Sequence, residues 1–153
     1  MEKIETEIVI ETEVVKVWRQ LTDFPSYPQW NPFITKIEGP LAEGARICFT
    51  AVLKGGRPAT FYPVLTIVKP GQELRWVGKL GFSWIFQGEH IFKLEEVGPG
   101  KTRLIHMEKF SGALNATGLV DGMLRKSRDG FMEMNEALKA LCEGGGGESG
   151  ASA

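Results

Sequence analysis

The sequence predicts an α+β domain in which a curved antiparallel sheet of seven strands wraps round one long C-terminal helix. Most of residues 33–112 reads as short runs with a period of two, separated by glycine and proline turns. Residues 119–142 instead place apolar side chains at alternating spacings of four and three, which is one face of an α-helix. Meandering strands joined by short turns form antiparallel sheets, and one face of such a sheet needs an apolar cover.

The elements follow in order from these two periods. Residues 3–11 alternate apolar and charged side chains, which predicts a half-buried strand. Helical spacing over 13–21 predicts a helix, and three prolines within 23–32 predict turns or one short helical turn. The remaining strands are expected at residues 33–38, 46–53, 60–68, 73–78, 83–96 and 102–110. The predicted order is therefore β-α-α-β-β-β-β-β-β-α.

One folded unit accounts for most of the chain. A length of 153 residues fits a single domain with one core, which we place at residues 1–143. Residues 144–153 read GGGGESGASA and hold too little apolar side chain to fold. We expect that tail to be disordered.

Composition excludes several classes of partner and site. The chain has 18 Lys and Arg against 19 Asp and Glu, so we expect no nucleic acid and no anionic membrane as a partner. Two cysteines without a CxxC pair make neither a disulfide framework nor a zinc pattern. The N-terminus is acidic rather than a signal peptide, and no apolar run approaches the ~18 residues that membrane insertion requires. We therefore expect a cytoplasmic protein with no metal and no cofactor, and the oligomeric state stays open.

The strand period places three ionisable side chains in one interior. Even-numbered residues of 83–96 and 102–110 are predicted to face the helix, so His90, His106 and Glu108 point inward together. Burying an unpaired carboxylate costs several kcal/mol, so Glu108 must be paired, protonated or wetted by a cavity. Such groups can exchange protons near neutral pH, which general acid–base catalysis requires. A buried pair that merely fixes the sheet is an equally open interpretation.

Small residues interrupt the inner face of the long helix. Ser127 and Gly130 lie on or beside the apolar stripe, and a glycine costs about 1 kcal/mol relative to alanine inside a helix. They predict either a void under the helix or a close approach of the helix to the sheet.

Four segments together resemble the SRPBCC superfamily, the START-like or helix-grip group, and within it the polyketide cyclase/dehydrase branch. They are VWRQLTDFPSYPQWNPFI, GEHIFKL, TRLIHMEKFSG and GFMEMNEALKALCE, and the resemblance covers about residues 3–142. It implies the helix-grip fold with a deep, mostly apolar cavity. Members bind lipids, sterols, polyketides, quinones or hormones, and some are aromatases or cyclases. The matching positions are Trp30, Asn31, Pro32, His90, Glu108 and Phe110. Of these, the resemblance makes the Trp30–Pro32 segment a structural corner.

The first functional hypothesis is the binding of a small hydrophobic molecule, whether lipid-like, polyketide or aromatic, between sheet and helix. The expected ligand-contacting residues are Trp76, Phe86, His90, Phe92, His106, Glu108, Phe110, Met123, Ser127, Phe131 and Met134. One alternative is a cyclase, aromatase or dehydratase that uses His90 and Glu108 as its acid and base. A second alternative is a protein-interaction module.

Overall fold

The computed structural model describes residues 2–53, 55–79, 87–113 and 121–152. Its elements alternate much as expected, with eight strands and three α-helices among the described residues. The strands are β1 (Glu2–Ile10), β2 (Ile34–Glu38), β3 (Cys48–Ala51), β4 (Ala59–Phe61), β5 (Val64–Lys69), β6 (Glu73–Lys79), β7 (Gln87–Gly98) and β8 (Lys101–Ser111). The helices are α1 (Val14–Thr22), a 3-10 turn η1 (Phe24–Ser26), α2 (Tyr27–Trp30) and α3 (Asp121–Ser152).

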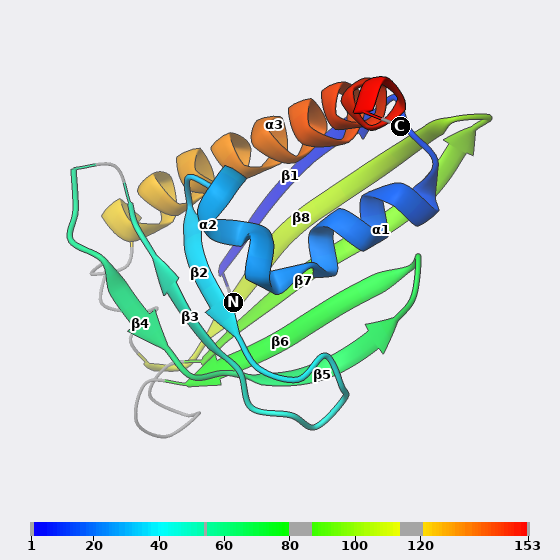
Figure 1. Cartoon of the computed structure of the whole chain (residues 1–153). Coiled ribbons are helices and arrows are strands. Elements are labelled where there is room, and N and C mark those ends of the chain that lie inside the picture. Colours follow the sequence, from blue (N-terminus) through cyan, green and yellow to red (C-terminus); the bar gives the residue numbers. More distant parts are fainter. Residues whose placement is uncertain (1, 54, 80–86, 114–120, 153) are drawn as a thin grey trace.

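All strand pairs are antiparallel, and together they form a curved surface that holds α3 (Figure 1). The larger sheet has the order β1-β8-β7-β6-β5, and the smaller one has the order β2-β3-β4. Helix α3 crosses the concave side along β1, while α1 and α2 lie beside it over the same side. The predicted α+β helix-grip fold is confirmed.

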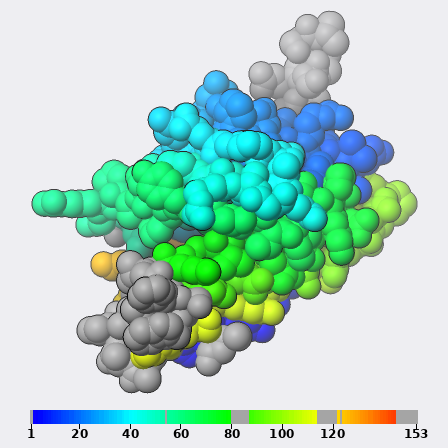
Figure 2. All heavy atoms as spheres, turned by 90° about the horizontal axis from the view of Figure 1, so that it is seen from below, coloured from blue at the N-terminus to red at the C-terminus, as the bar shows by residue number. Residues whose placement is uncertain are grey.

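The predicted single strand over residues 60–68 is instead two strands. Tyr62 and Pro63 separate β4 from β5, because proline has no N–H to donate to a sheet ladder. The two sheets remain joined, since the backbone of residues 44–47 hydrogen-bonds along 63–65. Eight strands in two connected sheets thus replace the expected seven in one, and the β3–β4 hairpin projects from the body (Figure 2).

The register confirms which side chains of the main sheet face α3. Trp76 lies opposite His90, and His90 lies opposite Glu108, so all three share the concave face. On the convex face Arg75 pairs with both Glu73 and Glu89. The convex face also buries Ile91 and Met107, which explains why the alternation in these strands is less clean than in β1.

Helix α3 presents its apolar stripe to the sheet. Phe131, Met134, Leu138 and Cys142 are all at most 1% exposed. As the structure has it, the helix continues to Ser152 and so includes most of the tail for which the sequence predicts disorder. The disorder expected of residues 144–153 stays a prediction.

The corner before β2 is a hydrogen-bonded turn. The side-chain Oδ1 of Asn31 accepts from the backbone N–H groups of Phe33 and Ile34, at 2.9 and 2.8 Å. Pro32 lies inside this turn. The turn directs Phe33 under α3, where its ring packs on Phe131 with a centroid distance of 5.5 Å. The structural role expected for residues 30–32 agrees with this geometry.

Gly130 is the point of closest approach between α3 and this corner. A Cβ at Gly130 would lie 2.5 Å from Cδ1 and 2.7 Å from Cε1 of the Phe33 ring. Of the two sequence-based expectations, a void or a close approach, the structure therefore has the close approach.

Replacing Gly130 by alanine is expected to destabilise the protein, although alanine is the better helix former by about 1 kcal/mol. The new methyl must displace a buried aromatic ring, and overpacking of this kind costs about 1–3 kcal/mol. Urea denaturation of Gly130→Ala against Gly144→Ala measures the effect. Nothing lies within 4 Å of a Cβ at Gly144, so that control should be neutral or stabilising. Equal stabilisation by both substitutions would contradict the close approach.

Among the described residues, no helix is both long enough and apolar enough to cross a membrane.

Candidate functional site

The concave face carries a cluster of stacked rings beneath α3. Trp76 stacks on His90 with centroids 4.9 Å apart, and Phe131 lies flat against His106 at 4.1 Å and 3°. Phe92 contacts both imidazoles, with centroids 4.9 Å from His90 and 4.3 Å from His106. Three residues predicted to line the site, Trp76, Phe92 and Phe131, therefore meet around the two histidines.

Most of the remaining predicted residues lie near the same core. Phe110, Ser127 and Met134 are buried, at 3%, 8% and 1% exposed. Phe86 lies outside the described residues, and the side chain of Met123 is likewise not described.

A continuous chain of hydrogen bonds crosses this aromatic cluster. The Nε2 atoms of His90 and His106 are 2.7 Å apart, and Nδ1 of His106 is 2.8 Å from Oδ1 of Asn135. The Asn135 amide donates to the Thr6 hydroxyl at 2.9 Å, and that hydroxyl donates to the backbone carbonyl of His106 at 2.9 Å. At the other end, Nδ1 of His90 is 3.6 Å from Oε1 of Glu108.

The direction of this chain is fixed from its backbone end. A carbonyl can only accept, so the single hydroxyl proton of Thr6 is used there and the hydroxyl must accept from the Asn135 amide nitrogen. The amide oxygen of Asn135 then faces His106, whose Nδ1 must donate to it. A neutral His106 has its lone pair on Nε2, so Nε2 of His90 is the donor between the two rings.

His106 stays neutral in the folded protein. Burial lowers the pKa of His106 well below its ordinary value of 6.5, and the nearby His90 lowers it further. The hydrogen bond to Asn135 acts in the opposite direction but is the smallest of the three causes. Burial therefore favours the neutral form of His106, which is the form that the hydrogen-bonded tautomer requires.

The consequence for His90 is that its Nδ1 faces the carboxylate. This contact joins the end of the hydrogen-bonded network to a carboxylate. The separation of 3.6 Å is an ion-pair contact rather than a hydrogen bond. The network thus has one end fixed by Asn135 and Thr6 and the other end at Glu108.

Glu108 is the member of this network that solvent can reach. Its side chain is 20% exposed, whereas that of His90 is 4% exposed. Its neighbours on the same face of β8, His106 and Phe110, are at most 3% exposed. Glu108 is therefore a partly accessible carboxylate on a face that is otherwise buried.

Sequence reasoning did not single out Asn135 or Thr6. Both occupy inward positions, Thr6 in the alternation of β1 and Asn135 four residues after Phe131 on α3. A polar side chain at such a position needs a partner, and that requirement was the available signal.

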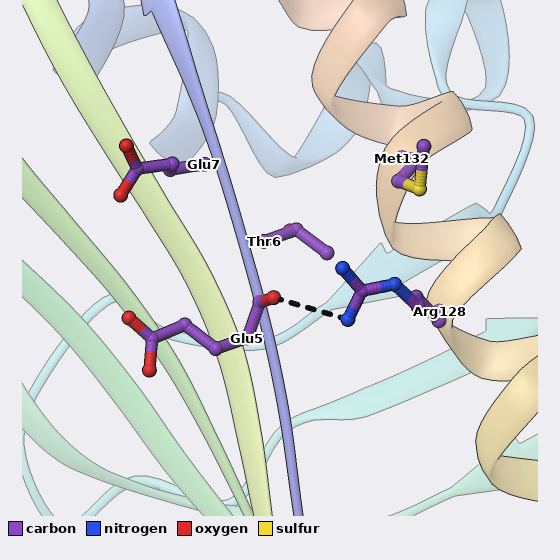
Figure 3. Close-up of a pocket in the computed structure, with 5 residues that line it drawn as sticks. All are labelled: Glu5, Thr6, Glu7, Arg128 and Met132. Carbon is purple, nitrogen blue, oxygen red and sulfur yellow. Dashed lines mark hydrogen bonds between the residues drawn. The ribbon is translucent and has the colours of Figure 1, made fainter.

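Two surface hollows lie among the described residues, and none of the residues predicted to contact a ligand lines either of them. One, of about 410 Å³, lies between β1 and α3 and is lined by Glu5, Thr6, Glu7, Arg128 and Met132 (Figure 3). There the Arg128 guanidinium donates to the backbone carbonyl of Glu5 at 3.3 Å. The other, of about 490 Å³, is lined by Pro32, Met132, Glu133 and Glu136. Both border Met132, which is 49% exposed, and neither reaches the two histidines.

No group of three or more described His, Cys, Asp or Glu side chains is arranged to hold a metal ion.

Solved structures with the same architecture come from several bacteria. The Zhui aromatase/cyclase from Streptomyces sp. R1128 superposes with a TM-score of 0.74 at 15% identity, over 93% of each chain. A START superfamily protein from Mycobacterium smegmatis gives 0.70 at 19% identity, over 92% of this chain and 97% of that one. A protein from Mesorhizobium loti gives 0.71 at 18% identity, over 93% and 97%. Likeness at these identities concerns the fold.

Comparison of the sequence itself gave two results. Residues 1–143 match the profile of the family described as polyketide cyclase / dehydrase and lipid transport. Among curated proteins, none matches the sequence significantly.

Proposed function

Because the chain belongs to the polyketide cyclase/dehydrase and lipid transport family, we propose that it binds a small hydrophobic molecule between the sheet and α3. The observation that carries this proposal is the partly exposed carboxylate of Glu108 on an otherwise buried aromatic face. Binding sites for small molecules are mostly apolar, with a few polar groups that set the orientation of the ligand. Glu108 among aromatic side chains is such an arrangement.

The network suggests a division of roles among the polar residues. Both ring nitrogens of His106 are already engaged, so we place it behind the site, where it orients His90. His90 then supports Glu108 from Nδ1, and Glu108 is the group that meets the ligand. Trp76, Phe110 and Phe131 supply the apolar surroundings, and Phe86 and Met123 stay predictions.

The proposal is tested by thermal unfolding with a panel of neutral aromatic, polyphenol, quinone and lipid compounds. A ligand that binds the folded state increases the free energy of unfolding, by about 2.7 kcal/mol when its concentration is a hundred times its Kd. The melting temperature rises as a result. Native mass spectrometry of the protein purified from its own host would identify a retained molecule. Absence of any shift across the panel, with no retained molecule, would remove the proposal.

A second candidate function is proton transfer to a bound carbonyl compound. The specific observation in its favour is the 3.6 Å contact between Nδ1 of His90 and Oε1 of Glu108, of which the carboxylate end is partly accessible. In this mechanism Glu108 removes a proton alpha to a carbonyl and returns it to the oxygen formed in an aldol-type cyclisation or lost in a dehydration, while His90 positions the carboxylate from Nδ1. General acid–base groups contribute typically 10²–10⁴-fold, so Glu108→Gln should lower turnover by about that factor, and His90→Ala should lower it as well. Unchanged rates in both variants would exclude this mechanism and leave the binding proposal intact.

The protein-interaction alternative receives less support. Among the described residues, exposed large apolar side chains are mostly scattered, which is normal for a protein surface. The neighbours Phe61 and Tyr62, 46% and 62% exposed, are the exception at the end of β4. Nothing in the structure indicates what would cover them.

A further inference from the structure

We propose that this site selects neutral ligands that carry a hydroxyl donor, such as phenols, and rejects ligands whose polar end is a carboxylate. The inference rests on the proposed binding function and adds the chemical class of the ligand. It follows from which polar atoms of the interior remain accessible and from the charges that face them.

The accessible polar edge of the network is an acceptor. The ring nitrogens that join His90 and His106 are committed to each other, and the Asn135 and Thr6 side chains are satisfied within the network. The accessible oxygen of the Glu108 carboxylate has a lone pair to offer. A ligand hydroxyl can donate to that oxygen, and hydrogen bonds to charged groups are stronger than those between neutral groups.

Backbone geometry places this carboxylate. Gly88 lies on β7, two residues before His90, which is the residue that faces Glu108. A Cβ built on Gly88 would lie 2.6 Å from Oε2 of Glu108. Glycine at position 88 therefore lets the carboxylate rest against the backbone of β7. Any larger residue there would push it away from its present position.

Among the described residues, no buried lysine or arginine offers a counter-ion to an anionic ligand. The buried polar residues among those described are Thr6, Asn31, His90, Thr102, His106, Ser127 and Asn135, with no lysine or arginine. Of the residues outside the described part, 80–86 and 114–120 have no charged side chain in their sequence, whereas residue 54 is a lysine. What the His90–Glu108 contact adds at the accessible edge is a carboxylate.

These charges decide between two ligands of the same shape. A buried carboxylate without a partner is strongly unfavourable because it loses its hydration. Next to Glu108 it would also meet a second carboxylate. A hydroxyl in the same place loses little hydration and gains a charge-assisted hydrogen bond.

The test compares 2-naphthol, 2-naphthoate and naphthalene by isothermal titration calorimetry at neutral pH, on the full chain. Wild-type protein should bind 2-naphthol at least about tenfold more tightly than 2-naphthoate. Glu108→Gln keeps the size of the side chain and removes its charge, so the preference should shrink about tenfold or reverse. Glu96→Gln, which alters an exposed carboxylate of β7, is the matched control and should leave the preference unchanged.

Gly88→Ala gives an independent reading, because it displaces the Glu108 carboxylate while leaving its charge in place. It should weaken 2-naphthol binding several-fold without raising the affinity for 2-naphthoate. Circular dichroism and the affinity for naphthalene confirm that each variant is folded and that its apolar site is intact.

Three other outcomes would each overturn one part of the proposal. Equal or tighter binding of 2-naphthoate by the wild type overturns the selectivity but not the binding function. A preference that Glu108→Gln leaves unaltered overturns the assignment to Glu108. Failure of all three probes to bind the wild type overturns the proposed binding of small aromatics and this inference with it.

Discussion

Replacing Phe131 by alanine is expected to lower the free energy of unfolding by about 3–5 kcal/mol, the range for deleting a buried aromatic side chain. Phe131 is fully buried and stacks on His106, and it also contacts Phe33 and His90. The cavity cannot collapse easily, because the hydrogen-bonded histidines on one side and the Asn31 turn on the other are both fixed. Chemical denaturation monitored by tryptophan fluorescence measures the change.

The neighbouring substitution Met132→Ala is the matched control. Met132 lies on the same helix but is 49% exposed, and substitutions at exposed positions usually stay within ±0.5 kcal/mol, roughly. A loss below about 1 kcal/mol for Phe131→Ala would mean that the ring is not close-packed between sheet and helix. In that case the aromatic cluster could not hold the histidines as described.

Stability is expected to fall as the pH decreases below about 6.5, because of His106. Burial holds the pKa of His106 well below 6.5, so the folded state keeps it neutral where the unfolded chain already binds a proton. The unfolded state then binds more protons, and the free energy of unfolding drops with decreasing pH. One proton gives a slope of at most about 1.4 kcal/mol per pH unit, or a loss of about 2 kcal/mol from pH 6.5 to about pH 5.

Denaturation curves of wild type and His106→Gln between about pH 7 and pH 5 test this assignment. The groups that face His106 are His90 and Phe92 on β7 and Phe131 and Asn135 on α3, and His90 is the ionisable one among them. The variant should be less stable at neutral pH, because glutamine cannot keep both hydrogen bonds, but its curve should be flatter. Parallel pH curves for the two proteins would show that His106 does not stay neutral on folding.

Much of the fold was readable from local patterns. The period of two in β1, β6, β7 and β8 follows from strand geometry alone, and it placed Trp76, His90 and Glu108 on one face. The break between β4 and β5 was missed, although Pro63 was visible, because the apolar pattern runs through it. The convex burial of Ile91 and Met107 was missed because it depends on neighbouring strands, which a single-strand pattern does not contain.

The candidate site was predictable as a set of residue types and not as a network. Strand period brought His90, His106 and Glu108 together, but no pattern in the sequence states which nitrogen meets which oxygen. The partners Thr6 and Asn135 lie 129 residues apart in the sequence, and only folding makes them neighbours.

The sequence by itself determined the elements, their order and the inward direction of the polar side chains, because backbone periodicity depends on near neighbours. Only the tertiary structure decided the distances: that Phe33 fills the space beside Gly130, that His106 is enclosed by its hydrogen bonds, and that Glu108 keeps an accessible edge. Those distances depend on how β1, β7, β8 and α3 pack on one another. That packing is set by contacts between segments far apart in the chain. The sequence pattern of a single segment does not show which contacts it will make.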